Sequence, residues 1–143
     1  MQRILVIKLS ALGDFVLGLG PMQAIRAAHP DAEITLLTTK GLAPLAKASG
    51  LFQQIWLDER PKLWRVGAVL GLRRRLREVG FERVYDLQTS SRTGWYFRLF
   101  WPGERPEWSG TAPGCSHPDL NPVRNTLHLV EAQAGQLAAA GIA

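Results

Sequence analysis

The stretch that decides the fold is residues 3–14, with the sequence RILVIKLSALGD. Residues 4–7 form an unbroken apolar run with β-branched members, short enough for a strand buried on both faces. Residues 10–13 break this pattern, and from Asp14 onward apolar side chains recur at helical spacing. They are Phe15, Leu19, Met22, Ile25 and Ala28. We therefore expect a buried parallel strand that passes through a tight turn into a helix.

Asp14 stands at this turn and has two interpretations. Aspartate and serine are favoured at helix starts, where they cap free backbone N–H groups. In open α/β sheets, however, such a turn lies at the carboxyl ends of the strands, where ligands bind. On residue types alone both interpretations stay open.

The same alternation of patterns continues along the chain. Strand patterns occupy residues 33–38, 54–57 and 83–87, and helix patterns occupy residues 42–48, 66–79 and 91–100. Strands that alternate with helices indicate βαβ units, and hence a parallel sheet with right-handed crossovers. We predict an α/β fold with a Rossmann-like parallel sheet flanked by helices.

The last third of the chain has a different texture. Proline and glycine punctuate residues 101–124, which we expect to be irregular apart from a short strand around residues 107–109. A last helix is predicted at about residues 125–140. We treat residues 1–143 as one domain.

Composition narrows the functional classes. A hydrophobic content of 46% with 20% charged residues is typical of a soluble globular protein. The excess of 17 Lys and Arg over 12 Asp and Glu gives a net charge of +5, which attracts phosphates, acidic sugars, anionic bilayers or nucleic acid. Cys115 is the only cysteine, so there is no internal disulfide and no cysteine-based metal site, as suits a reducing cytoplasm. No stretch has the length and apolarity of a signal peptide core or a membrane span.

A second polar constellation, residues 86–92 with the sequence DLQTSSR, follows the strand at residues 83–87. Consecutive hydroxyls, backbone donors at a helix start and an arginine suit an anionic or polyhydroxylated ligand. In a parallel sheet this strand end shares an edge with residues 10–14. The alternative, in which Ser91 caps a helix and Arg92 is a solvated surface residue, stays open.

Several short sequence motifs resemble motifs of glycosyltransferase family 9, the ADP-heptose:lipopolysaccharide heptosyltransferases, and occur in the same order. They are IKLSALGD at 7–14, GP at 20–21, AIR at 24–26, HPDAEIT at 29–35 and DLQ at 86–88. The resemblance extends over nearly the whole chain and is weakest at residues 101–124. It implies a bacterial enzyme of the GT-B architecture, in which two Rossmann-like lobes enclose the site. The first lobe binds the acceptor and supplies an aspartate, and the second binds ADP-heptose.

The resemblance implies that residues 1–143 correspond to the N-terminal, acceptor-binding lobe. The helix at about 125–140 then leads to the second lobe, which this sequence lacks. The implied reaction is inverting transfer of heptose from ADP-heptose to the lipopolysaccharide inner core. We expect the isolated 143-residue chain to be inactive, and to be able to self-associate through the exposed interdomain face.

The resemblance also assigns residues. It implies that Asp14 is the catalytic base and that no metal or cofactor takes part. Acceptor contacts are implied near the two strand ends and in a basic loop. They are Ser10, Ala11, Leu12, Gly13, Arg60, Lys62, Gln88, Thr89, Ser90 and Arg92. Many family members have Gly-Asn after the DLQ word, whereas this chain has Thr-Ser, a departure that bears on the identity of the acceptor.

The implied partners are the lipopolysaccharide core acceptor and the nucleotide-sugar donor. The location is the cytoplasm, with peripheral contact at the inner face of the inner membrane, to which the arginines at 73–75 and 77 can contribute. Tryptophans and basic residues are not interleaved in a nucleic-acid-binding pattern, so no nucleic-acid partner is expected. Two alternatives stay open: a GT-B glycosyltransferase that uses another nucleotide sugar, and a non-catalytic Rossmann-like module that binds anionic glycolipid.

Overall fold

The computed structural model describes residues 2–9, 12–58, 65–100, 106–112, 114–119 and 129–142. Of the predicted site residues, Ser10, Ala11, Arg60 and Lys62 lie outside these ranges, as does the segment 120–128. The strands are β1 (Arg3–Ile7), β2 (Glu33–Thr38), β3 (Gln54–Leu57), β4 (Arg83–Asp86), β5 (Glu107–Gly110) and β6 (His117–Pro118). The helices are α1 (Leu12–Ala28), α2 (Ala43–Ser49), α3 (Val66–Val79), α4 (Ser91–Arg98) and α5 (Leu129–Ala139).

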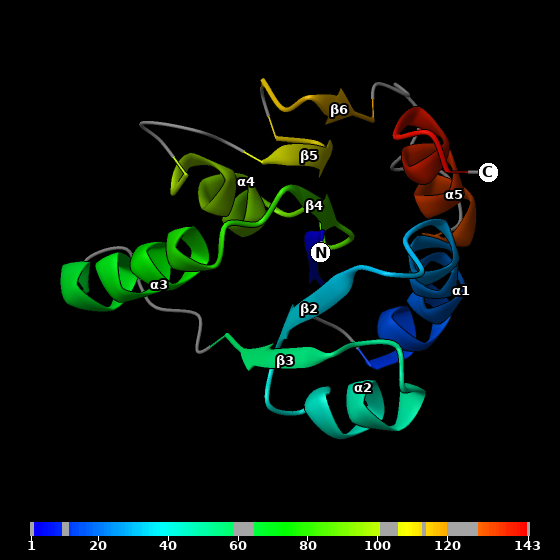
Figure 1. Ribbon diagram of the computed structural model, residues 1–143, viewed down its shortest axis with the longest axis horizontal. Helices are drawn as coiled ribbons and strands as arrows, with labels where there is room; N and C mark the ends of the chain where they lie inside the picture. The colour runs from blue at the N-terminus through cyan, green and yellow to red at the C-terminus, as the bar shows by residue number, and fades with distance from the viewer. Residues whose placement is uncertain are drawn as a thin grey trace.

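The described residues form a six-stranded sheet in the order β3-β2-β1-β4-β5-β6, in which every neighbouring pair is parallel. Helices cover both faces: α1, α2 and α5 lie on one side and α3 and α4 on the other (Figure 1). The predicted Rossmann-like α/β fold is confirmed.

Strand β1 shows why its sequence is apolar on both faces. Ile4 and Val6 point into the core under α1, α2 and α5, whereas Leu5 and Ile7 point into the core under α3 and α4. All four side chains are fully buried. A strand at the middle of a parallel sheet needs apolar side chains in both directions, and this run provides them.

The segment at 101–124 contains two strands in its described parts. Strand β5 lies where a short strand was expected, and it pairs with β4. Strand β6 was not expected, because it consists of two residues that carry no alternating pattern. It pairs with the end of β5 at the edge of the sheet, where Pro118 is tolerated.

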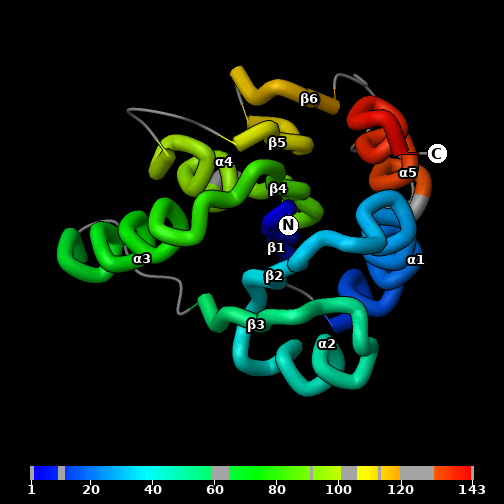
Figure 2. The backbone as a smooth tube through the Cα atoms, viewed as in Figure 1, coloured from blue at the N-terminus to red at the C-terminus, as the bar shows by residue number. Residues whose placement is uncertain are grey.

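The strand order fixes where a ligand site belongs. From β1 the chain passes to β2 and then β3 on one side, and from β4 it passes to β5 and β6 on the other. The direction in which strands are added to the sheet reverses between β1 and β4, near the centre of the view in Figure 2. In doubly wound sheets this switch point opens a crevice at the carboxyl ends of the two strands.

Within the described ranges, no helix has the length and apolarity to cross a bilayer.

Candidate active site

The exits of β1 and β4 lie side by side at the switch point. The strands pair with Ile7 opposite Asp86, and the Leu87 amide donates to the Ile7 carbonyl at 3.1 Å. One residue further, the Leu9 amide donates to Oε1 of Gln88 at 3.0 Å. The Gln88 side chain therefore holds the two exits together, a structural role for a residue predicted to contact the acceptor.

Asp14 lies in the first turn of α1, directly after the β1 exit. Its side chain is exposed, as are Leu12 and Gly13 beside it. A carboxylate in a first helical turn interacts favourably with the helix dipole. Asp14 is thus placed at the carboxyl edge of the sheet and open to an incoming molecule. Its catalytic role stays a prediction.

Lys8 is the charged residue of this site that the sequence did not single out. It is only 3% exposed, and its Nζ donates to the Leu87 carbonyl at 3.4 Å. Burial lowers the pKa of Lys8, while the nearby negative charges of Asp14 and Asp86 raise it. The Lys8 ammonium therefore acts electrostatically on both carboxylates. A lysine between two apolar residues at a strand end was the signal for it.

Asp86 forms the buried floor of the site. Its Oδ1 accepts from the backbone amides of Gln88 at 3.0 Å and Thr89 at 2.8 Å, which shapes the turn after β4. Burial raises the pKa of Asp86 to about 6, although the Thr89 amide and the charge of Lys8 oppose the rise. Asp86 therefore changes protonation state in the mildly acidic range.

The end of β5 approaches Asp86 closely because Gly110 has no side chain. A Cβ at Gly110 would lie 3.1 Å from Cβ of Asp86 and 3.0 Å from Nε1 of Trp108. Such distances are shorter than ordinary packing contacts. Glycine at this position lets β5 bring Thr111 and Ala112 to the edge of the site.

The turn after Gln88 carries an unusual backbone conformation. Thr89 has a φ of 47°, the left-handed region that a β-branched residue seldom adopts. Glycine adopts positive φ without steric cost and would fit this position with less strain. Ser90 then caps α4: its Oγ accepts from the Thr93 amide at 3.3 Å, and Oγ1 of Thr93 accepts from the Ser90 amide at 2.9 Å.

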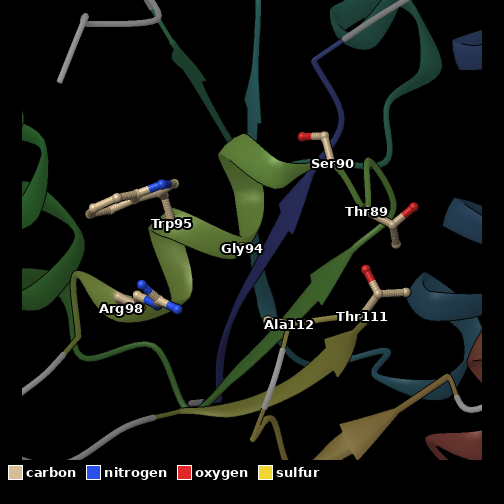
Figure 3. Close-up of a pocket in the computed structure, with 7 residues that line it drawn as sticks. All are labelled: Thr89, Ser90, Gly94, Trp95, Arg98, Thr111 and Ala112. Carbon is tan, nitrogen blue, oxygen red and sulfur yellow. The ribbon is translucent and has the colours of Figure 1, made fainter.

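A pocket of about 300 Å³ opens beside this turn. Figure 3 shows that the exits of β4 and β5 and one side of α4 form its walls. It is lined by Thr89, Ser90, Gly94, Trp95, Arg98, Thr111 and Ala112. The guanidinium of Arg98 lies 5.6 Å from the Trp95 ring centroid. Hydroxyls, an aromatic face and a cation suit a polyhydroxylated or anionic ligand, and the predicted residues Thr89 and Ser90 are part of this wall.

Arg92 is placed differently from Thr89 and Ser90. Its guanidinium donates to the Tyr96 hydroxyl at 3.4 Å, and that hydroxyl donates to Asp58 in a short hydrogen bond. Burial and then the bond to Asp58 raise the pKa of Tyr96 above its ordinary value. The phenol therefore keeps its proton and joins α4 to the residue after β3. Arg92 belongs to this network and does not line the pocket.

Helix α5 contributes two buried glutamines that sequence reasoning missed. Nε2 of Gln136 donates to the carbonyls of Asp86 at 2.8 Å and Ser109 at 3.2 Å. Nε2 of Gln133 donates to the Leu87 carbonyl at 3.2 Å. These amides attach α5 to the strand ends beneath the site. Two glutamines three residues apart on the apolar side of a helix were the available signal.

The structure thus places Lys8 near both Asp14 and Asp86, at the paired exits of β1 and β4 that Gln88 joins. The pocket begins one residue further, at Thr89. Across the parts of the chain that are described, no cluster of three or more His, Cys, Asp or Glu could hold a metal ion. The predicted contacts at Arg60 and Lys62 lie outside the described residues.

Comparisons with protein-family profiles and with curated proteins give no match, whereas solved structures do. A glycosyl transferase of family 9 from Veillonella parvula DSM 2008 superposes with a TM-score of 0.80 at 19% identity, over 99% of this chain and 42% of that chain. The E. coli heptosyltransferase WaaC, solved with ADP-2-deoxy-2-fluoro heptose, gives 0.71 at 16% identity, over 99% and 49%. E. coli ADP-heptose lps heptosyltransferase II gives 0.63 at 22% identity, over 78% and 31%.

This chain therefore spans less than half the length of these enzymes. At these identities the likeness establishes the fold, and the first two matches extend over nearly every residue. The chain has the Rossmann-like α/β fold found in family 9 glycosyltransferases, as the motifs at residues 7–14 and 86–88 predict.

Proposed function

We propose that this chain is the N-terminal, acceptor-binding lobe of an inverting GT-B glycosyltransferase that transfers heptose from ADP-heptose to the lipopolysaccharide inner core. The observation that carries the proposal is the position of Asp14. It is an exposed carboxylate in the first turn of α1, at the switch point of the sheet, with the Lys8 ammonium nearby.

In the proposed reaction Asp14 is the general base. The oxygen of the acceptor hydroxyl forms a bond to the anomeric carbon of the donor sugar, and the bond from that carbon to the ADP phosphate oxygen breaks. ADP leaves with the electron pair, and the hydroxyl proton passes to the Asp14 carboxylate. A neutral hydroxyl is a weak nucleophile, so a base placed in this way contributes roughly 10²–10⁴-fold to the rate.

The remaining residues hold the acceptor or shape the site. Thr89, Ser90 and Arg98 offer hydroxyls and a cation to sugar hydroxyls and anionic substituents. Lys8 and Asp86 are too buried to contact the acceptor and instead fix the charge beneath it. The donor is expected to bind mainly to a second lobe, as the lengths of the matched enzymes allow.

The decisive experiment replaces Asp14 with asparagine in an enzyme that joins this chain to a donor-binding lobe. We expect heptose transfer to fall at least about a hundredfold, the lower end of the contribution of a general base. Binding of the lipopolysaccharide core oligosaccharide should remain, because the amide keeps the shape of the carboxylate. The matched control is Asp31→Asn, an exposed carboxylate in the turn before β2, which should leave the rate unchanged.

The isolated 143-residue chain provides the second readout. It should bind the core oligosaccharide, with amide NMR shifts near residues 12–14 and 88–92, and transfer no heptose. Full turnover by Asp14→Asn would leave Asp14 with only a capping role. Transfer by the isolated chain at the rate of a complete heptosyltransferase would contradict the proposed division between two lobes.

A further inference from the structure

Helix α3 carries a stripe of side chains that the proposed catalytic function does not use. Its members recur at intervals of three and four residues, so they share one side of the helix. The stripe consists of Val66 and Leu70 in the first half of α3 and Arg73, Arg74 and Arg77 in the second half. We refer to these five residues as the α3 stripe.

The apolar half of the α3 stripe faces away from the core. Val66 is 61% exposed and Leu70 is 54% exposed, among the largest exposures of apolar side chains in the described residues. The sheet-facing side of the helix packs through Leu76, with Leu72 and Val79 half-buried beside it. Figure 2 shows α3 reaching outward on the left of the domain.

Two of the three arginines in the basic half of the α3 stripe are available as well. Arg74 and Arg77 are exposed, and within the described part of the chain neither takes part in a hydrogen bond or an ion pair. Together with Leu70, Arg73 and Glu78 they line an open groove of about 430 Å³. Arg75 lies on another side of α3 and makes a cation–π contact, with its guanidinium 4.1 Å from the Trp56 ring centroid.

We propose that the α3 stripe docks this domain on an anionic lipid bilayer. Guanidinium groups form bidentate hydrogen bonds with lipid phosphates, and leucine and valine gain free energy by entering the boundary between headgroups and acyl chains. The charge of the stripe is complementary to such a surface. A nucleic acid would contact the arginines but would give Val66 and Leu70 nothing apolar to enter.

The position of the α3 stripe on the domain suits this role. Helix α3 follows the parallel strand β3, so its apolar first turn lies toward the carboxyl edge of the sheet, the edge that carries Asp14. Docking through α3 would hold that edge near the membrane surface. The basic residue of α2, Lys47, lies on the opposite face of the sheet.

The test measures binding of the 143-residue chain to large unilamellar vesicles by co-sedimentation. We expect binding to vesicles that contain phosphatidylglycerol, weakening as salt is raised, and little binding to vesicles of phosphatidylcholine alone. The double variant Arg74→Gln/Arg77→Gln should lower the partition constant about 25-fold, since each basic residue near an anionic surface is worth roughly fivefold, equivalent to about 1 kcal/mol. The matched control, Lys47→Gln, removes an exposed charge from α2 on the opposite face of the sheet and should lower the partition constant less than Arg74→Gln alone.

A second variant, Leu70→Asn, tests the apolar half at constant charge. It should weaken vesicle binding while the salt dependence stays that of the unmodified chain, and circular dichroism should show an intact fold because Leu70 is exposed. The proposal is overturned if the chain does not bind anionic vesicles, or if Lys47→Gln loses as much affinity as Arg74→Gln alone. It is also overturned if Leu70→Asn has no effect, and tight binding to a DNA duplex in that case would identify a nucleic-acid surface instead.

Discussion

Lys8 and Asp86 place opposite charges in the buried floor of the candidate site, 3% and 1% exposed. Burying a charge costs more than an ion pair usually returns, so apolar residues in these places would often stabilise the protein. The sequence nevertheless keeps a lysine at the end of β1 and an aspartate opposite Ile7. Because Lys8 also interacts with the exposed carboxylate of Asp14, we interpret the pair as part of the electrostatics of the site.

The raised pKa of Asp86 leads to a prediction about stability and pH. An ordinary aspartate in the unfolded chain loses its proton near 3.8, whereas Asp86 in the folded chain loses it at about 6. Between these pH values the folded state binds more protons, so the contribution of Asp86 is most favourable below the lower value and declines as pH rises through the higher one. The pKa difference corresponds to a decline on the order of 3 kcal/mol.

Comparing the unmodified chain with Asp86→Asn separates the contribution of Asp86 to the free energy of unfolding from those of other titrating groups. One such group is Glu107, whose pKa is lowered by Arg83. In urea unfolding, the free energy of the variant minus that of the unmodified chain should increase between pH 4 and pH 7. The ¹³C shift of the Asp86 carboxyl carbon should report the same pKa directly. A difference that does not change with pH, together with a carboxyl titration near the ordinary value, would contradict the prediction.

At the scale of elements, local patterns predicted most of the fold. The β-branched run at residues 4–7 became β1, and the patterns at residues 33–38, 54–57 and 66–79 became β2, β3 and α3 at the same bounds. Each of these elements has a continuous pattern that its own residues carry. Helix α1 begins at Leu12, two residues before the helical pattern predicted from Asp14.

Features that depend on distant parts of the chain could not be predicted in this way. Strand β6 exists because residues 117–118 can pair with the end of β5, and two residues contain no period to detect. Gln133 and Gln136 read as polar interruptions of a helix until the carbonyls of β4 and β5 are placed beneath them. At the candidate site, the sequence predicted that the turn at Asp14 and the turn after Asp86 lie at the same edge of the sheet. It did not predict that Lys8 is buried there and interacts with both carboxylates.

The attachment of α5 gives a prediction at this scale. Gln136→Leu keeps the size of the side chain but removes the donor for the carbonyls of Asp86 and Ser109, which remain buried. We expect a loss of about 1–3 kcal/mol in the free energy of unfolding. Gln23→Leu, an exposed position on α1, is the matched control and should change stability by less than about 0.5 kcal/mol. Equal stability of the two variants would show that the Gln136 amide does not hold α5 in place.

At the scale of the whole molecule, apolar burial is unevenly distributed. Strands β1 and β2 lie between two cores and are almost entirely buried. Helix α3 has Leu76 as its one fully buried residue, and leaves Val66 and Leu70 in solvent. Because local opening is easiest where few apolar contacts are lost, the domain should not exchange its amide hydrogens uniformly.

We predict that native-state hydrogen exchange is slowest in β1 and β2 and that α3 exchanges faster than α1. Helix α1 has five buried residues, among them Phe15, Met22 and Ile25, so its amides should open only with the global unfolding of the domain. The amides of α3 should open by local unfolding, with an opening free energy that is lower than the free energy of global unfolding and does not depend on it. Mass spectrometry of peptides from α1 and α3 in increasing urea separates the two cases, because local opening is nearly insensitive to denaturant and global opening is not. If the amides of the two helices exchanged at the same rate with the same urea dependence, α3 would be part of the cooperative core. The exposure of its leucine and valine would then not result from weak attachment of the helix.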